Sequence, residues 1–112
     1  MVQHESLTAL TRHHLEVARE APSGRSAHTV FGGHDNVLRQ TLIALRAASA
    51  LDEHENPGEA TVQVLHGHVT LMSEDASRDG SAGDLLVVPD TRHSLRANED
   101  SAILLTVGKR TT

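Results

Sequence analysis

Two histidines at the ends of short apolar segments are the residues of this chain best placed to do chemistry. His93 closes a segment that begins at a turn glycine, Gly83, continues as a short apolar strand and reaches Pro89. His54 precedes a Pro-Gly turn, a second strand and a closing glycine, Gly67. Imidazole binds transition metals and exchanges protons near neutral pH. Histidines that bracket two strands in this way predict one shared site facing a cavity.

Each histidine also has a structural interpretation. His54 is flanked by two glutamates, which favour a protonated turn histidine in solvent. His93 could be a buried imidazole bonded to the backbone. Alternation along a strand predicts that His93, Leu95 and Ala97 share its inward face.

Composition narrows the function classes. The chain has 112 residues, enough for one domain with one core, and no cysteine, so any metal must be held by His, Asp, Glu or Gln. A net charge of −5 and a single aromatic residue, Phe31, argue against a nucleic-acid partner. No leader-like segment and no membrane span is evident, so we expect no membrane partner and a cytoplasmic location.

The hydrophobic pattern predicts one helix followed by short strands. Residues 6–21 have helical spacing, with Ser6 as the cap, and 1–24 is expected to be an extension of a 25–112 β-barrel domain. Turn signals at about ten-residue spacing predict an all-β sandwich or barrel. The expected strands are 26–31, 37 to about 51, 60–65, 68–72, 84–88, 93–97 and 102–107, with 73–82 as a polar tip.

The two histidine segments together resemble the paired motifs of the cupin superfamily, which are small jelly-roll barrels, also called double-stranded β-helices. The family's motifs read G-x5-H-x-H-x3,4-E-x6-G and G-x5-P-x-G-x2-H-x3-N. The first falls on Ala48, His54, Asn56, Ala60 and Gly67, and the second on Gly83, Pro89, Thr91, His93 and Asn98. The resemblance covers roughly residues 26 to 108 and implies a cupin barrel with one N-terminal α-helix.

The resemblance also implies a metal site, from which this chain departs. Cupins typically hold a metal with three imidazoles and one carboxylate or amide, whereas here Asn56 and Ala60 stand at two of these positions. His93 falls one residue early after the proline, which implies a shortened turn. The expected metal ligands are therefore His54 and His93, for one divalent ion that could be Zn, Ni, Fe, Mn or Cu.

Three further residues are candidates for ligand binding or for completing the metal site. Asn56 offers an amide to a metal or to a bound molecule. Glu59 lies beside the lost carboxylate position, and Gln63 would reach the site if a bulge reversed its facing. Plain alternation instead places Glu59 and Gln63 on the face opposite Ala60.

Three functions remain open at this point. The first is a module that binds a small, mostly uncharged molecule in the barrel, with a partial metal site. The second is a metal-dependent cupin enzyme of the dioxygenase, isomerase or decarboxylase type, and the third is a metal-free barrel with a role in assembly. The resemblance also implies a homodimer, for which the apolar segments 42–45 and 103–107 are taken as edge contacts.

Overall fold

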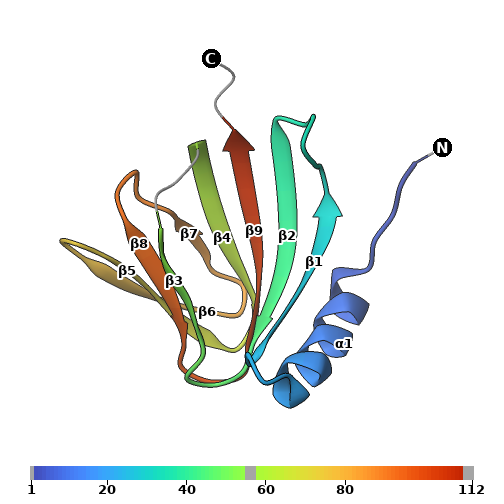
Figure 1. Ribbon diagram of the computed structural model, residues 1–112, viewed down its shortest axis with the longest axis horizontal. Coiled ribbons are helices and arrows are strands. Elements are labelled where there is room, and N and C mark those ends of the chain that lie inside the picture. The colour runs from blue at the N-terminus through green and yellow to red at the C-terminus, as the bar shows by residue number, and fades with distance from the viewer. Residues whose placement is uncertain (1, 55–57, 110–112) are drawn as a thin grey trace.

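The computed structural model describes residues 2–54 and 58–109, which form one helix and a set of short antiparallel strands (Figure 1). In chain order, from the N-terminal helix to the last strand, the elements are α1 Leu7–Glu20, β1 Arg25–Phe31, β2 Leu38–Leu45, β3 Ala50–His54, β4 Gly58–His66, β5 His68–Ser73, β6 Ser77–Ser81, β7 Leu85–Val87, β8 His93–Ala97 and β9 Ser101–Lys109.

The strands form two facing sheets. One has the order β1-β2-β9-β4-β7 and the other the order β3-β8-β5-β6, so consecutive strands repeatedly cross from one sheet to the other. This topology is the jelly-roll, or double-stranded β-helix, that the sequence predicted, and the fold class is confirmed. Figure 1 shows β3 and β8 on the left and β4, β9 and β2 to their right.

The core is aliphatic because alternate residues of each strand point between the sheets. In β4, Ala60, Val62 and Val64 are buried, whereas Glu59 and Gln63 are exposed, as alternation predicted. Side chains of both sheets meet in one cluster. Its buried members are Ile43, Leu45, Ala60, Val62, Val64, Val69, Leu71, Val88, Leu95, Ala97 and Ile103.

Helix α1 covers part of the outer face of the five-stranded sheet. The Ser6 hydroxyl accepts a hydrogen bond from the backbone N–H of Ala9, which confirms its predicted role as the cap. Leu15 and Ala18 are buried against Ala44 of β2 and Ala102 of β9. The helix therefore closes a second, smaller apolar cluster outside the barrel (Figure 1).

Two predictions about strands are wrong. The segment 37–51 is not one strand, because β2 ends at Leu45 and a turn carries the chain into the other sheet before β3. In that turn Ala48 has a φ of 73° and the Asp100 carboxylate accepts the N–H of Ala47. The predicted polar tip 73–82 contains strand β6, which pairs with β5.

The predicted dimer segments are not sheet edges. Strand β9 is central in its sheet and β2 lies beside it, and Leu42, Leu45 and Ile103 are fully buried within the chain. Their apolar character reflects burial on one or both faces rather than a free edge. No helix of the described residues is long and apolar enough to cross a membrane.

Candidate functional site

His93 is buried at one end of the barrel. It begins β8, only 7% of it is exposed, and it shares the inward face with Leu95 and Ala97, which confirms the predicted alternation. Its Nδ1 lies 2.8 Å from the carbonyl oxygen of Thr91. A carbonyl oxygen can only accept, so Nδ1 donates the proton in this hydrogen bond.

The backbones of His54 and His93 are cross-strand partners in the ladder between β3 and β8. This pairing brings the two motif histidines to the same end of the barrel at the level of the backbone. The side chain of His54 and the whole of Asn56 lie outside the described residues. The position that carries a carboxylate in the family motif is the buried methyl group of Ala60.

The described residues alone do not fit a metal ion. Among the side chains that the structure describes at the four metal-ligand positions of the motifs, only His93 can bind a metal, because the Ala60 methyl group cannot coordinate. No group of three metal-ligating side chains occurs among the residues that the structure describes. Structural zinc sites use four protein ligands and catalytic ones three, so one imidazole is insufficient.

Glu59 and Gln63 do not join His93. Both side chains are exposed on the outer face of β4. Glu59 lines a separate surface depression of about 490 Å³, together with Thr61, Val87 and Asp90. The bulge that would turn Gln63 inward does not occur, because the register between β4 and β9 is regular from Gly58 to Val64.

The interior around His93 is almost filled. The void there measures about 30 Å³ and is bounded by aliphatic side chains. A single water needs roughly 10–15 Å³ of such space, so the void has room for very little more. The residues that line it are Leu51, Val62, Leu71, Val88, His93, Leu95, Ile103 and Leu105.

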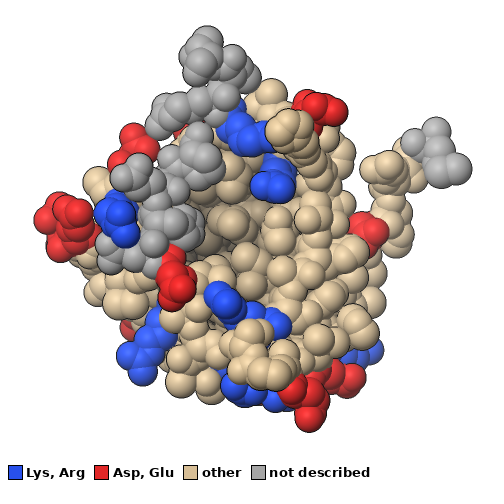
Figure 2. All heavy atoms as spheres, in the orientation of Figure 1, with Lys and Arg blue, Asp and Glu red and all other residues tan. Residues whose placement is uncertain are grey.

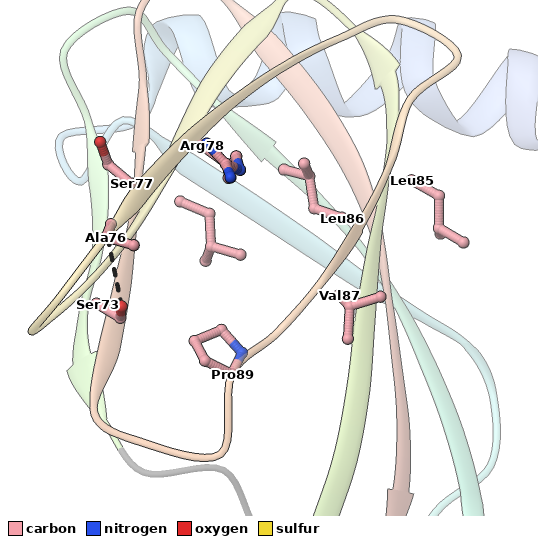
Figure 3. A pocket seen from close by; sticks show the side chains of 9 residues that line it. Ser73, Ala76, Ser77, Arg78, Leu85, Leu86, Val87 and Pro89 are labelled. Carbon is pink, nitrogen blue, oxygen red and sulfur yellow. Dashed lines mark hydrogen bonds between the residues drawn. The ribbon is translucent and has the colours of Figure 1, made fainter.

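A larger pocket opens at the seam between the two sheets, where the β5–β6 hairpin lies opposite β7 (Figure 3). Its volume is about 430 Å³, in the range of small-molecule sites. Leu71 lines both this pocket and the void beside His93, so the two spaces adjoin at this side chain. The lining is Leu71, Ser73, Ala76, Ser77, Arg78, Leu85, Leu86, Val87 and Pro89.

Among the described residues that line the pocket, Arg78 is the one that carries a charge. It is the cross-strand partner of Leu71, and two residues further along β6 the buried Gly80 packs against Val64 and Leu86. Arg78 and Gly80 thus share the inward face of β6. Arg78 was not among the predicted site residues, because Ser77–Ser81 contains no apolar residue to signal a strand.

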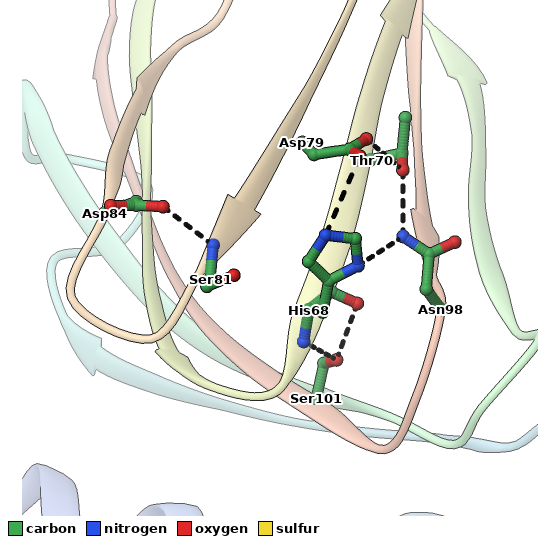
Figure 4. A network of polar contacts seen from close by, with 7 residues as sticks. All are labelled: His68, Thr70, Asp79, Ser81, Asp84, Asn98 and Ser101. Atoms are coloured by element: carbon green, nitrogen blue, oxygen red, sulfur yellow. Dashed lines mark hydrogen bonds and ion pairs between the residues drawn. The ribbon is translucent and has the colours of Figure 1, made fainter.

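A polar network lies on the outer face of the four-stranded sheet (Figure 4). The Asn98 amide donates to Nδ1 of His68 and to the hydroxyl of Thr70, both at 2.8 Å. The Thr70 hydroxyl donates to Asp79 at 2.7 Å, and Nε2 of His68 lies 3.7 Å from the same carboxyl group. The network links β5, β6 and the end of β8, and Thr70 and Asp79 lie on the face of these strands opposite Leu71 and Arg78.

Comparisons with known proteins bear on the fold. No family model and no curated protein matches the sequence. A conserved protein of unknown function from Streptococcus pyogenes is 23% identical, with a TM-score of 0.74 over 99% of this chain and 93% of its own. A cupin superfamily protein from Desulfitobacterium hafniense is 17% identical, with a TM-score of 0.70 over 98% of this chain and 95% of its own.

A third similar structure is an enzyme. Salicylate 1,2-dioxygenase from Pseudaminobacter salicylatoxidans is 20% identical, with a TM-score of 0.73 over 89% of this chain but only 33% of its own. At these identities the likeness concerns the fold. The chain therefore has the fold of a small cupin domain, as the paired motifs predicted.

Charges on the surface are dispersed. On the face shown in Figure 2, Lys and Arg alternate with Asp and Glu around the rim, and the middle of the face is largely uncharged. Phosphate backbones bind to continuous basic surfaces. The described residues on this face form no such surface.

Proposed function

We propose that this protein binds a small molecule in the pocket between the β5–β6 hairpin and β7. The observation that carries the proposal is the pocket itself: it measures about 430 Å³, is mostly aliphatic and shares Leu71 with the space beside His93. The motifs predict His54 and His93 at that end of the barrel. Because the interior beside His93 is almost filled, we expect the ligand at the seam between the two sheets.

Uncharged compounds with an apolar body test this function directly. We expect benzamide and hexanamide, at millimolar concentration, to shift the backbone amide resonances of Ser73, Leu86 and Val87, which line the pocket. Ala76→Trp should abolish these shifts, because Ala76 is an exposed lining residue where an indole would occupy the opening. Ala47→Trp, in an exposed turn elsewhere, is the matched control.

Two results would contradict the proposal. One is the absence of any shift with either compound or with the corresponding acids, benzoate and hexanoate, at concentrations that leave the protein folded. The other is a set of shifts that Ala76→Trp leaves unchanged, since the compounds would then bind elsewhere.

A metal-dependent cupin enzyme is the second candidate, and the backbone pairing of His54 with His93 supports it. Such a site would need Asn56 or another donor in addition to the two imidazoles, because two ligands hold a divalent ion weakly. Metal content by mass spectrometry on protein purified without chelators decides the question. Near one equivalent in the wild type, lost in both His54→Ala and His93→Ala, would favour the enzyme.

We further propose that the protein forms a homodimer through the outer face of the five-stranded sheet. One cross-strand row on that face is uncharged, and its two end residues, Phe31 and Val87, are 42% and 74% exposed. Light scattering at micromolar concentration tests this, and a monomer would remove the proposal. The row consists of Phe31, Gln40, Thr106, Thr61 and Val87.

A further inference from the structure

Arg78 lies at an exposed position of the edge strand β6, on the side of the strand that faces the mostly aliphatic lining of the pocket. Arg78 lies opposite Leu71 in the β5–β6 ladder, and its side chain points into the pocket in Figure 3. No carboxylate of the described residues is within ion-pair distance of its guanidinium. The pocket therefore combines an aliphatic wall with one cation that no acidic side chain of the described chain neutralises.

We infer that the pocket selects small monoanions with an apolar body, such as carboxylates carrying a short aliphatic or aromatic group. This inference rests on the proposed function and names the ligand class of the same site. The Arg78 guanidinium would bind the carboxylate with two parallel N–H donors, a geometry that suits arginine better than lysine. Leu71, Leu86 and Pro89 would contact the apolar body.

The charges around the pocket favour a ligand with one negative charge over a ligand with several. Glu74 and Asp75 are exposed in the turn of the same hairpin, directly before the lining residue Ala76. The chain as a whole carries a net charge of −5. A phosphate or a dicarboxylate would meet one cation and at least two nearby carboxylates, whereas a monoanion needs only the single guanidinium.

The position of Arg78 also has an explanation that involves no ligand. Strands β6 and β7 are the edges of their sheets, and an inward-pointing charge on an edge strand hinders pairing with another chain. Under that explanation Arg78 protects against aggregation and does not affect ligand choice. The two explanations make different predictions for the same substitution.

Titrations with matched pairs of an acid and its amide distinguish ligand selection from edge protection. We would titrate benzoate against benzamide, and hexanoate against hexanamide, into the wild type, Arg78→Gln and Arg96→Gln at pH 7.5. Within each pair the shape is nearly constant and only the charge changes. Arg96 is exposed on the outward face of β8, in the same sheet, so Arg96→Gln makes the same change of net charge away from the pocket.

The wild type and Arg96→Gln should bind each acid about ten-fold or more tightly than its amide, the ratio that a charge-assisted hydrogen bond supports. Arg78→Gln should remove that preference and keep the amide affinity. Arg78→Lys should give an intermediate preference, because the charge stays and the bidentate geometry is lost. Circular dichroism spectra matching the wild type would show that each variant is folded.

Equal affinity for acid and amide in the wild type would overturn the monoanion inference and leave the proposed function standing. A preference for the acid that Arg78→Gln retains would also overturn it. Binding that is unchanged in Arg78→Gln, together with increased aggregation of that variant, would favour edge protection. If neither member of either pair binds at millimolar concentration, the proposed function itself fails, and the inference with it.

Discussion

Ser73 of β5 is the cross-strand partner of His93 of β8, so a residue that lines the open pocket lies beside the buried motif histidine. The pocket and the motif end of the barrel are therefore adjacent. Leu71, two residues earlier in β5, contacts both spaces. A ligand in the pocket would contact both Ser73 and Leu71, which adjoin His93 or the void beside it, so the packing of His93 is the first property to measure.

We expect His93→Ala to lower the free energy of unfolding by about 2 kcal/mol, because it removes a buried ring from an aliphatic environment and leaves a cavity. His93→Leu fills a similar volume and should cost about half as much, since the lost bond to the Thr91 carbonyl is worth about 1 kcal/mol. Urea unfolding monitored by circular dichroism measures both values.

If His93→Leu were as destabilising as His93→Ala, the polar contacts of the ring rather than its volume would hold this end of the barrel together.

Much of the fold is predictable from the sequence, because alternation and turn glycines are local signals. Strand β8 runs from His93 to Ala97 as expected, and Gly67 and Gly83, both read as turn positions, have φ values of 86° and 97°. Strand β6 is not predictable in this way. Its one buried residue is Gly80, and its place depends on pairing with β5 and on packing against Leu86.

The pocket could not be predicted for the same reason. It is formed where the β5–β6 hairpin meets β7 across the seam of two sheets, and no spacing within either segment signals that meeting. The motif positions drew attention to Glu59 and Gln63, which face outward, whereas Arg78 belongs to no motif.

The two turn glycines should respond differently to alanine. Gly83→Ala should cost about 1–2 kcal/mol, because the left-handed backbone strains any residue with a Cβ, while the space around it is open. Gly67→Ala adds a collision of the new methyl group with the Asp100 carbonyl and the Ser101 hydroxyl, and should cost about 3–4 kcal/mol. Chemical denaturation measures the free energy of unfolding of both variants, and the difference between their losses gives the cost of the collision at Gly67.

Equal losses for the two variants would show that the backbone near Gly67 moves to accept a methyl group, and that the close approach to β9 is not required.

Removal of the Asn98 side chain should weaken the joint between β5 and β8 by about 1 kcal/mol. Its amide makes two donor bonds at a partly exposed site, to His68 and Thr70, and water replaces them only in part. Asn98→Ala should lower the thermal midpoint, whereas Asn36→Ala, in the exposed turn before β2, should change it less. A larger effect from Asn36→Ala would contradict this role for the network.

The stability of the helix contact should depend on pH through His14. Its ring stands between His13 and His28, with ring centroids 4.9 and 5.7 Å away, and its Nδ1 lies 2.6 Å from the Ser26 hydroxyl. Burial, and then the charges of the two neighbouring imidazoles, lower the pKa of His14 below its ordinary value of 6.5. The one carboxylate in ion-pair contact with the cluster among the described residues is Glu5, 3.7 Å from Nε2 of His28.

Because the folded state disfavours the protonated ring, the unfolded state binds more protons as the pH falls below 6.5. The contribution of His14 to stability is therefore fully present above that pH and is lost as the pH falls through the lowered folded-state pKa. Urea unfolding at pH 8 and pH 5 should show a smaller loss between the two values for His14→Gln than for the wild type. His66→Gln, which removes an exposed imidazole outside the cluster, controls for the missing titratable group. An equal loss in the wild type and His14→Gln would mean that the acid sensitivity of the fold originates elsewhere.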